Sequence, residues 1–316
     1  MATLWAMAWT TDDIGDLTGR RALITGVTGG LGRHTARELG RHGADLVVTA
    51  RDTAKADETL SWLAKESPGT SVDVVELDLA DLTASKRSAQ GVVDAYDRID
   101  LLINNAGIMI PPERRTVDGF ELQIATNHLG HFAWTAVLWP LLVASSARLV
   151  QVSSMAHTTV GSLDLDSLTP EGSKRPYRRW RSYGESKLAN LLFALELDRR
   201  ATAAGVDVVS VAAHPGYAAT NLTRTGVGVG GGGPIGFGMH QVTKVIGQSA
   251  RAGAWPLLMA ASDPTLTGGE YIGPKGFRQM RGRPHRVGMT SAARDPELAR
   301  DVWSASERAV GLDFTV

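Results

Sequence analysis

Short runs of apolar residues alternate along most of the chain with longer segments in which apolar residues return every three or four positions. Continuous runs of about four to eight residues are typical of strands buried on both faces, and the longer spacing is typical of helices. The runs predict strands over residues 20–25, 45–50, 72–77, 99–103, 148–152, 206–212 and 269–272. The intervening segments predict helices that end near residue 42 and span about 53–66, 81–96, 118–143, 183–200, 249–261 and 296–310. This alternation favours a single α/β domain on a parallel, doubly wound sheet with helices on both faces.

A glycine-rich turn separates the first strand from the first helix. Glycines at such a turn let the backbone approach a pyrophosphate, which is then held at the helix N-terminus. The spacing is G-x-x-x-G-x-G rather than G-x-G-x-x-G, and a glycine-rich turn without a ligand is the alternative. We expect the turn to bind a dinucleotide through Gly26, Thr28, Gly29, Gly30, Leu31 and Gly32.

The end of the second strand bears on the choice of dinucleotide. NAD-binding folds place a carboxylate here, on the ribose hydroxyls, but this strand ends in Ala50 and continues with Arg51. Without the carboxylate there is no repulsion of a 2′-phosphate, and an arginine offers it a forked donor. The sequence therefore favours NADP(H) over NAD(H), with Thr28 and Arg33 as further candidates for the same phosphate. Asp52 is expected to cap the next helix.

Polar groups and glycines also follow the later strands, at Asp78-Leu79, Asn104–Gly107, Ser153-Ser154 and His214-Pro215-Gly216. In open parallel sheets, ligands bind beyond the carboxyl ends of the strands. We expect these groups to meet at one edge of the sheet. His214 lies beside a proline turn, where a structural hydrogen bond is expected rather than acid–base catalysis.

Tyr183 and Lys187 are four residues apart, so they share one face of the helix predicted over 183–200. An ammonium near a phenol favours the phenolate and lowers the pKa of the phenol. The pair could then donate a proton to a carbonyl oxygen or accept one from an alcohol. The same spacing also occurs where an aromatic ring and a solvated charge merely share a helix face.

The composition excludes several kinds of site. The 316 residues carry a formal net charge of zero and no cysteine, so disulfides, thiolate metal sites and cysteine nucleophiles are excluded. His128 and His131 lie three apart with nothing nearby to complete a ligand set, so no metal is expected. A basic, aromatic run over 174–181 is expected to be a solvated loop or part of a substrate rim, and not a nucleic-acid site.

Residues 1–18 are expected to form an N-terminal tail. Residues 1–9 are apolar but lack a basic residue and a long apolar run, so they predict neither a signal peptide nor a membrane span. Trp5 and Trp9 are expected to pack on the domain or on a partner. Together with the absence of cysteine, these features lead us to expect a cytoplasmic protein. Residues 225–238 are nearly all glycine, valine and proline, a composition that suggests a lid.

Together these motifs resemble the short-chain dehydrogenase/reductase family, whose order they follow: Thr25-Gly26-x-x-x-Gly30-x-Gly32, Asn104-Asn105-Ala106-Gly107, Ser154, Tyr183-x-x-x-Lys187 and Pro215-Gly216. The resemblance covers about residues 19–273. It implies one Rossmann-like domain with strand order 3-2-1-4-5-6-7, and hydride transfer between a nicotinamide and a carbonyl or alcohol carbon. Residues 274–316 are then an extension whose terminal helix packs on the same domain.

The resemblance implies roles for individual residues. Tyr183 is the general acid/base, Lys187 lowers its pKa and binds the nicotinamide ribose, and Ser154 orients the substrate oxygen. Asn127 holds a water in a proton relay with Lys187. Beyond the glycine turn, Tyr183 and Lys187, the cofactor is contacted by Asp78, Leu79, Asn105, Ala106, Gly107, Pro215, Gly216 and Thr220.

A narrower resemblance points to the retinol-dehydrogenase-like branch, through Ala50–Asp52, Asn127–Phe132, Val152–His157 and Ser186–Asn190. It implies NADP(H) and a hydrophobic aldehyde, ketone or alcohol, bound by long loops over 155–180 and 217–247. Relatives often pair subunits through the helices around Asn127 and Tyr183, which leaves a homodimer, a homotetramer and a monomer open. Two other functions stay open: a non-catalytic NADP(H)-binding redox sensor, and a reductase of carbon–carbon double bonds on the same scaffold.

Overall fold

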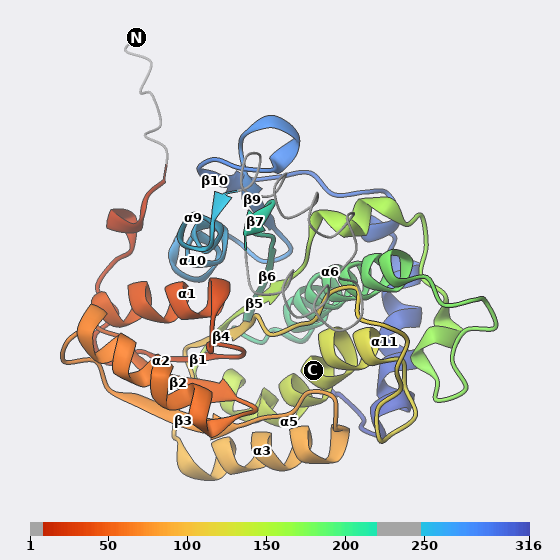
Figure 1. Cartoon of the computed structure of the whole chain (residues 1–316), viewed down its shortest axis with the longest axis horizontal. Coiled ribbons are helices and arrows are strands. Elements are labelled where there is room, and N and C mark those ends of the chain that lie inside the picture. The colour runs from red at the N-terminus through yellow and green to blue at the C-terminus, as the bar shows by residue number, and fades with distance from the viewer. Residues whose placement is uncertain (1–8, 220–247) are drawn as a thin grey trace.

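A twisted sheet forms the centre of the molecule, and the computed structural model describes residues 9–219 and 248–316 (Figure 1). Eight strands lie in the order β10-β9-β6-β5-β4-β1-β2-β3. All neighbours are parallel except β9 and β10. Apart from β10 this is the predicted order, so the doubly wound fold is confirmed. The strands are β1 (Arg21–Ile24), β2 (Asp45–Ala50), β3 (Val72–Glu76), β4 (Leu101–Asn104), β5 (Arg148–Val152), β6 (Val209–Ala213), β9 (Tyr271–Pro274) and β10 (Pro284–Arg286), with a separate short pair β7 (Ala218–Ala219) and β8 (Gln248–Ser249).

Helices cover both faces of the sheet because both faces of its strands are apolar. In β1, Leu23 faces the core under α3, α5 and α6, whereas Ala22 and Ile24 face the core under α1 and α10. Figure 1 shows these two helical layers on either side of the sheet. The helices are α1 (Gly30–Arg41), α2 (Thr53–Glu66), α3 (Leu82–Ala95), α4 (Leu122–Ile124), α5 (Gly130–Ala144), α6 (Arg179–Ala204), α9 (Ala250–Gly253), α10 (Trp255–Ser262) and α11 (Pro296–Val310).

The prediction of one long regular helix over 118–143 is wrong about where the helix begins and about its being α-helical throughout. The helix begins at Leu122 in α4, passes through a π-helical turn over Ala125–Leu129 and continues as α5. The carboxylate of Asp118 instead accepts a hydrogen bond of 3.0 Å from the amide of Leu82, the first residue of α3, whose N-cap is the predicted Asp81. Glu121 is the N-cap of α4, and its carboxylate accepts hydrogen bonds from the amides of Gln123 and Ile124.

Two other helices differ from the prediction. The helix of Tyr183 was expected over 183–200 but runs over Arg179–Ala204, so Tyr183 lies inside its second turn. The helix expected over 249–261 is broken at Ala254 into α9 and α10. Pro256 lies in the first turn of α10 and has no N–H, so it cannot donate the hydrogen bond to the carbonyl of Ala252 that would continue α9 into α10.

Both chain ends contribute to the folded domain. Of the expected N-terminal tail, Trp9 and Ile14 are buried in the core under α1 and α10. In the C-terminal part, β10 was not predicted, because Pro284–Arg286 shows no apolar run. It pairs with β9 as an antiparallel edge strand, so residues beyond 273 extend the same sheet.

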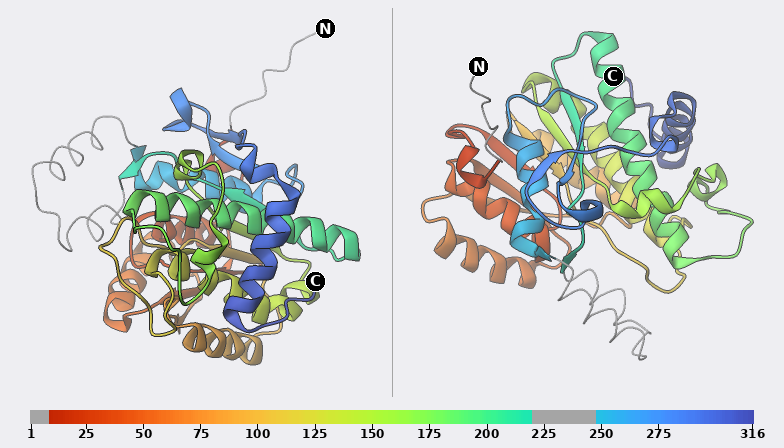
Figure 2. Two further views of the ribbon diagram at one scale, coloured as in Figure 1. Left: turned by 90° about the vertical axis from the view of Figure 1, so that its right-hand side faces the viewer. Right: turned by 90° about the horizontal axis from the view of Figure 1, so that it is seen from above.

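The terminal helix α11 packs on α6 and α5, and both views of Figure 2 show it beside α6. Its Trp303 is 1% exposed and joins an aromatic cluster with Phe132, Phe193 and Phe314. The ring centroids of Phe132 and Trp303 are 5.1 Å apart, in an edge-to-face arrangement that stabilises such pairs. The surface of α5 and α6 is therefore partly covered by the chain itself.

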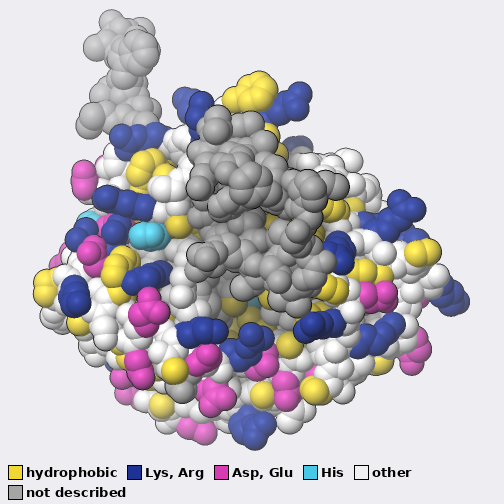
Figure 3. Space-filling model, in the orientation of Figure 1, with side chains coloured by type: hydrophobic (Ala, Val, Ile, Leu, Met, Phe, Trp, Pro, Cys, Tyr) yellow, Lys and Arg dark blue, Asp and Glu magenta, His cyan; other side chains and the backbone are white. Residues whose placement is uncertain are grey.

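Charged side chains of both signs are interspersed over the lower half of the face in Figure 3. Neither sign dominates there, which agrees with the formal net charge of zero. Within residues 9–219 and 248–316, no helix is long and apolar enough to cross a membrane.

Replacing Trp303 by Ala should lower the free energy of unfolding by about 3–5 kcal/mol, because the change empties a site between three aromatic rings. Urea denaturation followed by circular dichroism measures the loss. Val117→Ala is the control, since Val117 is 83% exposed, and it should change the stability by less than about 0.5 kcal/mol. A loss near zero for Trp303→Ala would mean that α11 does not pack as described.

Candidate active site

The predicted catalytic residues come from separate elements that meet at the carboxyl edge of the sheet. Ser154 is the second residue after β5, Tyr183 and Lys187 lie on α6, and Asn127 lies in the π-helical turn before α5. A Cβ atom placed on Gly107, in the turn after β4, would lie 2.9 Å from Asn127 Oδ1 and 3.6 Å from Lys187 Nζ. The structure thus brings Gly107, Asn127 and Lys187 into one small volume.

Tyr183 is buried, and the environment of its hydroxyl corrects one expectation. Burial raises the pKa of Tyr183, while a hydrogen bond with the Ser154 side chain lowers it, and burial is the larger effect. The pKa of Tyr183 therefore lies above its ordinary value, opposite to the lowering expected from Lys187. The Lys187 ammonium lies 5.9 Å from the centroid of the Tyr183 ring and donates its hydrogen bond elsewhere. Near neutral pH the phenol thus keeps its proton, as a general acid requires.

Lys187 is 3% exposed, and its Nζ donates to the carbonyl oxygen of Val152 at 3.1 Å. The side-chain amide of Asn190 donates to the same oxygen, also at 3.1 Å. Burial lowers the pKa of Lys187 to about 8. The ammonium is therefore charged at neutral pH and gives up a proton more readily than a solvated lysine does.

The side chain of Asn127 holds the loop after β4 against α6. Its Oδ1 accepts from the amide of Ile108 at 2.8 Å, and its Nδ2 donates to the carbonyl of Ile108 at 3.0 Å. The same Nδ2 lies 2.9 Å from the hydroxyl of Ser186. These contacts use both protons of Nδ2 and one lone pair of Oδ1, and the main-chain carbonyl oxygen of Asn127 lies 3.1 Å from Nδ1 of His131.

Close packing between two turns explains two of the glycines. A Cβ on Gly32 would lie 2.4 Å from the carbonyl oxygen of Gly26 and 2.6 Å from Asn105 Nδ2. Gly26 has a φ of 74°, and a Cβ there would lie 2.8 Å from Cα of Ala106. Such distances leave no room for a side chain, so the turns after β1 and β4 touch through their backbones.

The middle of the glycine turn is open to a ligand. Thr28 is exposed and Gly29 and Gly30 are half-buried at the N-terminus of α1, a helix of 12 residues. Free backbone amides and the helix dipole at such an end favour a phosphate. The backbone approach required by a pyrophosphate is thus built into the chain, and the residues present fit a dinucleotide.

The other predicted cofactor contacts are distributed around the same edge. Arg51 is exposed directly after β2, whereas the guanidinium of Arg33 packs 4.0 Å from the ring centroid of Trp62. Asp78 Oδ1 accepts from the amide of Ala80 at 3.0 Å. The side chain of Leu79 is buried in the core, and its carbonyl oxygen would lie 2.4 Å from a Cβ placed on Gly130. Arg51 is accordingly the stronger phosphate candidate.

His214 has the structural role expected of it. Its Nδ1 accepts from the amide of Gly216 at 3.1 Å, which leaves the proton on Nε2 to be donated to Gln279 Oε1 at 2.9 Å. Burial lowers the pKa of His214 to about 3, so the ring is neutral. The bonds fix the turn at Pro215-Gly216, while Thr220, the expected carboxamide contact, lies outside the described residues.

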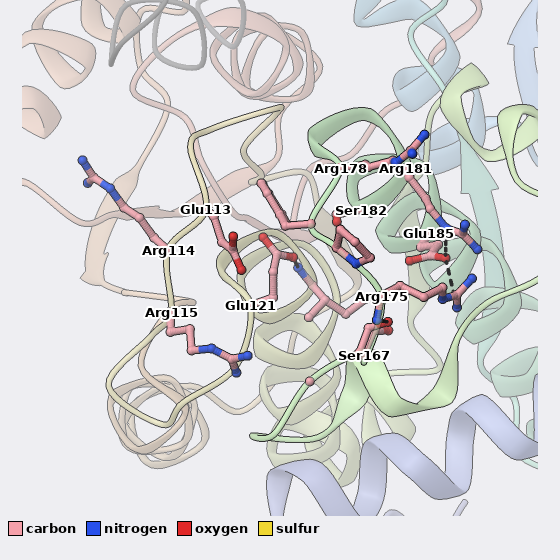
Figure 4. A pocket seen from close by; sticks show the side chains of 15 residues that line it. Glu113, Arg114, Arg115, Glu121, Ser167, Arg175, Arg178, Arg181, Ser182 and Glu185 are labelled. Carbon is pink, nitrogen blue, oxygen red and sulfur yellow. Dashed lines mark hydrogen bonds and ion pairs between the residues drawn. The ribbon is translucent and has the colours of Figure 1, made fainter.

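A pocket beside the N-terminal end of α6 is charged rather than apolar (Figure 4). It is lined by Arg175 and Arg181, which both pair with Glu185, by Glu121 and by Tyr177. Burial raises the pKa of Glu185 to about 7. Neither Ser154 nor Tyr183 lines this pocket, so the loop over 155–180 contributes to a polar cavity here.

Most of the second substrate loop, 217–247, lies outside the described residues, as does the lid suggested over 225–238.

The sequence analysis named Thr25 and His131 but gave neither residue its role in the site. The hydroxyl of Thr25 accepts from the amides of Asn105 and Ala106, each at 2.9 Å. His131 contacts the same hydroxyl and was considered only as a metal ligand. The available indications were the position of Thr25 at the end of an apolar strand and its place at the start of the glycine motif. Among the residues that the structure describes, no cluster of three or more His, Cys, Asp or Glu side chains could hold a metal.

Comparison with known proteins agrees with this geometry. Residues 20–163 match the family model described as short chain dehydrogenase. Human retinol dehydrogenase 13 is 35% identical over 300 residues, which cover 94% of this chain and 86% of the relative. The chain belongs to the short-chain dehydrogenase/reductase family. Mouse polyprenol dehydrogenase is 36% identical over 93% of this chain and 84% of its own length. These relatives place the chain in the retinol-dehydrogenase-like branch.

A solved structure of a protein from Mycobacterium paratuberculosis has the same fold, with a TM-score of 0.79. It is 39% identical, and the match covers 98% of this chain and all of that one. Members of the family are oxidoreductases that act on alcohol or carbonyl groups and bind a nicotinamide dinucleotide.

Replacing Gly32 by Ala should weaken dinucleotide binding by about tenfold or more, because the new methyl group separates the turns after β1 and β4. Quenching of intrinsic fluorescence on titration with NADPH and with NADH measures the affinity. Gly91→Ala on α3 is the matched control, since nothing lies within 4 Å of a Cβ there. It should leave the affinity unchanged and slightly raise the stability. Equal affinities of Gly32→Ala and the unchanged protein would contradict the close approach of the two turns.

Proposed function

We propose that this protein is an NADP(H)-dependent oxidoreductase that interconverts a hydrophobic aldehyde or ketone with its alcohol, and that Tyr183 is the general acid/base. The observation that carries the proposal is the juxtaposition of Ser154 and Tyr183 beside a buried ammonium, at the edge of the sheet where the glycine turn lies. Such a set has a use in proton transfer to a substrate oxygen, whereas a module that only binds a dinucleotide does not need it.

Each of these residues has a separate role in the proposed carbonyl reduction. When bound, the reduced nicotinamide supplies the hydride that the carbonyl carbon accepts. Ser154 donates a hydrogen bond to the substrate oxygen, and Tyr183 transfers its proton to that oxygen, which yields the alcohol. Lys187, with a pKa of about 8, then helps to return a proton to the phenolate. Alcohol oxidation follows the same steps in reverse.

Arg51 supports the preference for NADP(H). Its guanidinium is exposed at the carboxyl end of β2, and Ala50 stands where a carboxylate would exclude a 2′-phosphate. The names of the relatives, retinol dehydrogenase and polyprenol dehydrogenase, support a lipophilic alcohol or aldehyde as the substrate class. We keep the cytoplasm as the proposed location and a homodimer or homotetramer as the proposed assembly. An assembly that pairs α5 and α6 would have to include α11, which covers part of them.

Replacing Tyr183 by Phe should lower turnover by about two to four orders of magnitude and leave NADPH affinity nearly unchanged, because only the proton donor is lost. Stopped-flow fluorescence at saturating NADPH, with an aliphatic or aromatic aldehyde, measures the step. Tyr96→Phe serves as the control, since the Tyr96 hydroxyl bonds to Asp73 at 3.0 Å, away from the site. If Tyr183→Phe turned over as fast as Tyr96→Phe, the assigned role would be lost.

Replacing Arg51 by Ala should raise the KM for NADPH by about 10- to 100-fold, since a charged hydrogen bond to the 2′-phosphate contributes about 1.5–3 kcal/mol. The KM for NADH, which has no such phosphate, should stay constant. Steady-state kinetics with both cofactors give the comparison. Arg87→Ala on α3 is the control for loss of an exposed positive charge. Parallel changes in the two KM values of Arg51→Ala would refute the phosphate contact.

A further inference from the structure

His131 connects two parts of the site that lie far apart in the sequence. It lies one turn after Asn127, in the first turn of α5, and is fully buried. Its Nδ1 lies 3.1 Å from the carbonyl oxygen of Asn127, and its Nε2 lies 2.9 Å from the hydroxyl of Thr25. The ring thus spans from the π-helical turn to the end of β1.

The surroundings of Thr25 determine which ring nitrogen carries the proton. The amides of Asn105 and Ala106 both donate to Thr25 Oγ1, at 2.9 Å each, and so use its two lone pairs. The hydroxyl proton must then be donated. The nearest acceptor is His131 Nε2 at 2.9 Å, since the carbonyl of Ile103 lies at 3.5 Å. Nε2 is therefore unprotonated, and Nδ1 carries the proton that the Asn127 carbonyl accepts.

This arrangement leaves no hydrogen-bonding atom of Thr25 or of the His131 ring without a partner. A second proton on the ring would set an N–H against the hydroxyl of Thr25, whose lone pairs are already used. Burial lowers the pKa of His131 to about 3, the bond to Asn127 acts in the opposite direction, and the nearby charges of Lys187 and His128 lower it further. The ring is therefore neutral throughout the physiological range.

We propose that His131 is a positioning residue that sets the distance between the cofactor turn and the proton relay. On one side it orients the Thr25 hydroxyl, which holds the amides of Asn105 and Ala106. On the other its Nδ1–H is donated to the carbonyl of Asn127, the residue assigned to the relay, and so fixes the position of that residue. The role rests on the proposed function, because only a reaction that couples hydride and proton transfer needs both sides in register.

The hydrogen-bond assignment can be tested without any reaction. Nitrogen-15 NMR of histidine-labelled protein should show His131 as the neutral Nδ1–H tautomer, with no titration between pH 5 and pH 9. His131→Phe identifies the resonance by its disappearance. A neutral Nε2–H tautomer, or a midpoint near the ordinary histidine pKa of about 6.5, would overturn the bridge whether or not the protein is an enzyme.

Variants then test the positioning itself. Thr25→Val removes the hydroxyl and His131→Phe removes both ring nitrogens with similar shapes retained, whereas Thr25→Ser keeps the hydroxyl. We expect the first two to weaken NADPH binding and to slow single-turnover hydride transfer, each by about tenfold, and Thr25→Ser to behave like the unchanged protein. The double variant Thr25→Val/His131→Phe should be hardly worse than either single variant, because one bridge is lost in all three.

Three results would overturn the proposal. The first is a lower melting temperature with unchanged NADPH affinity and hydride-transfer rate, since the bridge would then be only structural. The second is full additivity of Thr25→Val and His131→Phe, and the third is a defect in Thr25→Ser as large as that in Thr25→Val. Failure of the proposed function would look different: the unchanged protein would transfer no hydride to any carbonyl, while the NMR result and the pattern of NADPH affinities would still hold.

Discussion

The backbone contact between the turns after β1 and β4 sets the geometry of the candidate site. Asn105 Nδ2 donates to the carbonyls of Thr25 and Gly26, at 2.8 and 3.0 Å, and Thr25 accepts from two amides of the facing turn. Gly26 and Gly32 permit this approach because a Cβ at either position would overlap the opposite turn. The dinucleotide turn and the loop that leads to Asn127 are therefore one unit, and a change in either displaces the other.

A buried ammonium is the second constraint on this part of the molecule. Lys187 lies under the end of β5, where the Val152 carbonyl accepts from it and from Asn190. A charge in such a place is costly unless it is hydrogen-bonded, and the cost appears as the lowered pKa of the lysine. Burial acts on Tyr183 in the opposite sense and raises its pKa. The same burial thus keeps the proton on the phenol and makes the ammonium a better proton donor.

Much of the architecture follows from the sequence because its causes are local. Continuous apolar runs gave the seven main strands, and the residues that follow them had to meet at the carboxyl edge. The family resemblance assigned Ser154 and Tyr183 to one substrate oxygen, and the fold brings their elements β5 and α6 together. By contrast, the π-helical turn and the hydrogen bond from Leu82 to Asp118 depend on tertiary contacts, and β10 pairs through its backbone without an apolar pattern.

The electrostatics of the site were harder to predict than its position. The direction of the pKa shift of Tyr183 depends on how completely packing excludes water, which the Tyr-x-x-x-Lys spacing does not express. From the sequence, His131 was considered only as a metal ligand. Its actual partner, Thr25, is 106 residues away in the chain, so no local pattern links the two. Side chains that act through such distant contacts carry no spacing that a sequence pattern can reveal.

The most direct test of the central claim is to follow the hydride itself. The unchanged protein would be incubated with NADPH deuterated at C4, in each of its two stereochemical forms, and with a hydrophobic aldehyde, and the alcohol would be analysed by mass spectrometry. We predict that one form of the cofactor delivers one deuterium to the carbinol carbon of each alcohol molecule. An alcohol without deuterium from either form, or no alcohol at all while NADPH is bound, would contradict hydride transfer at this site.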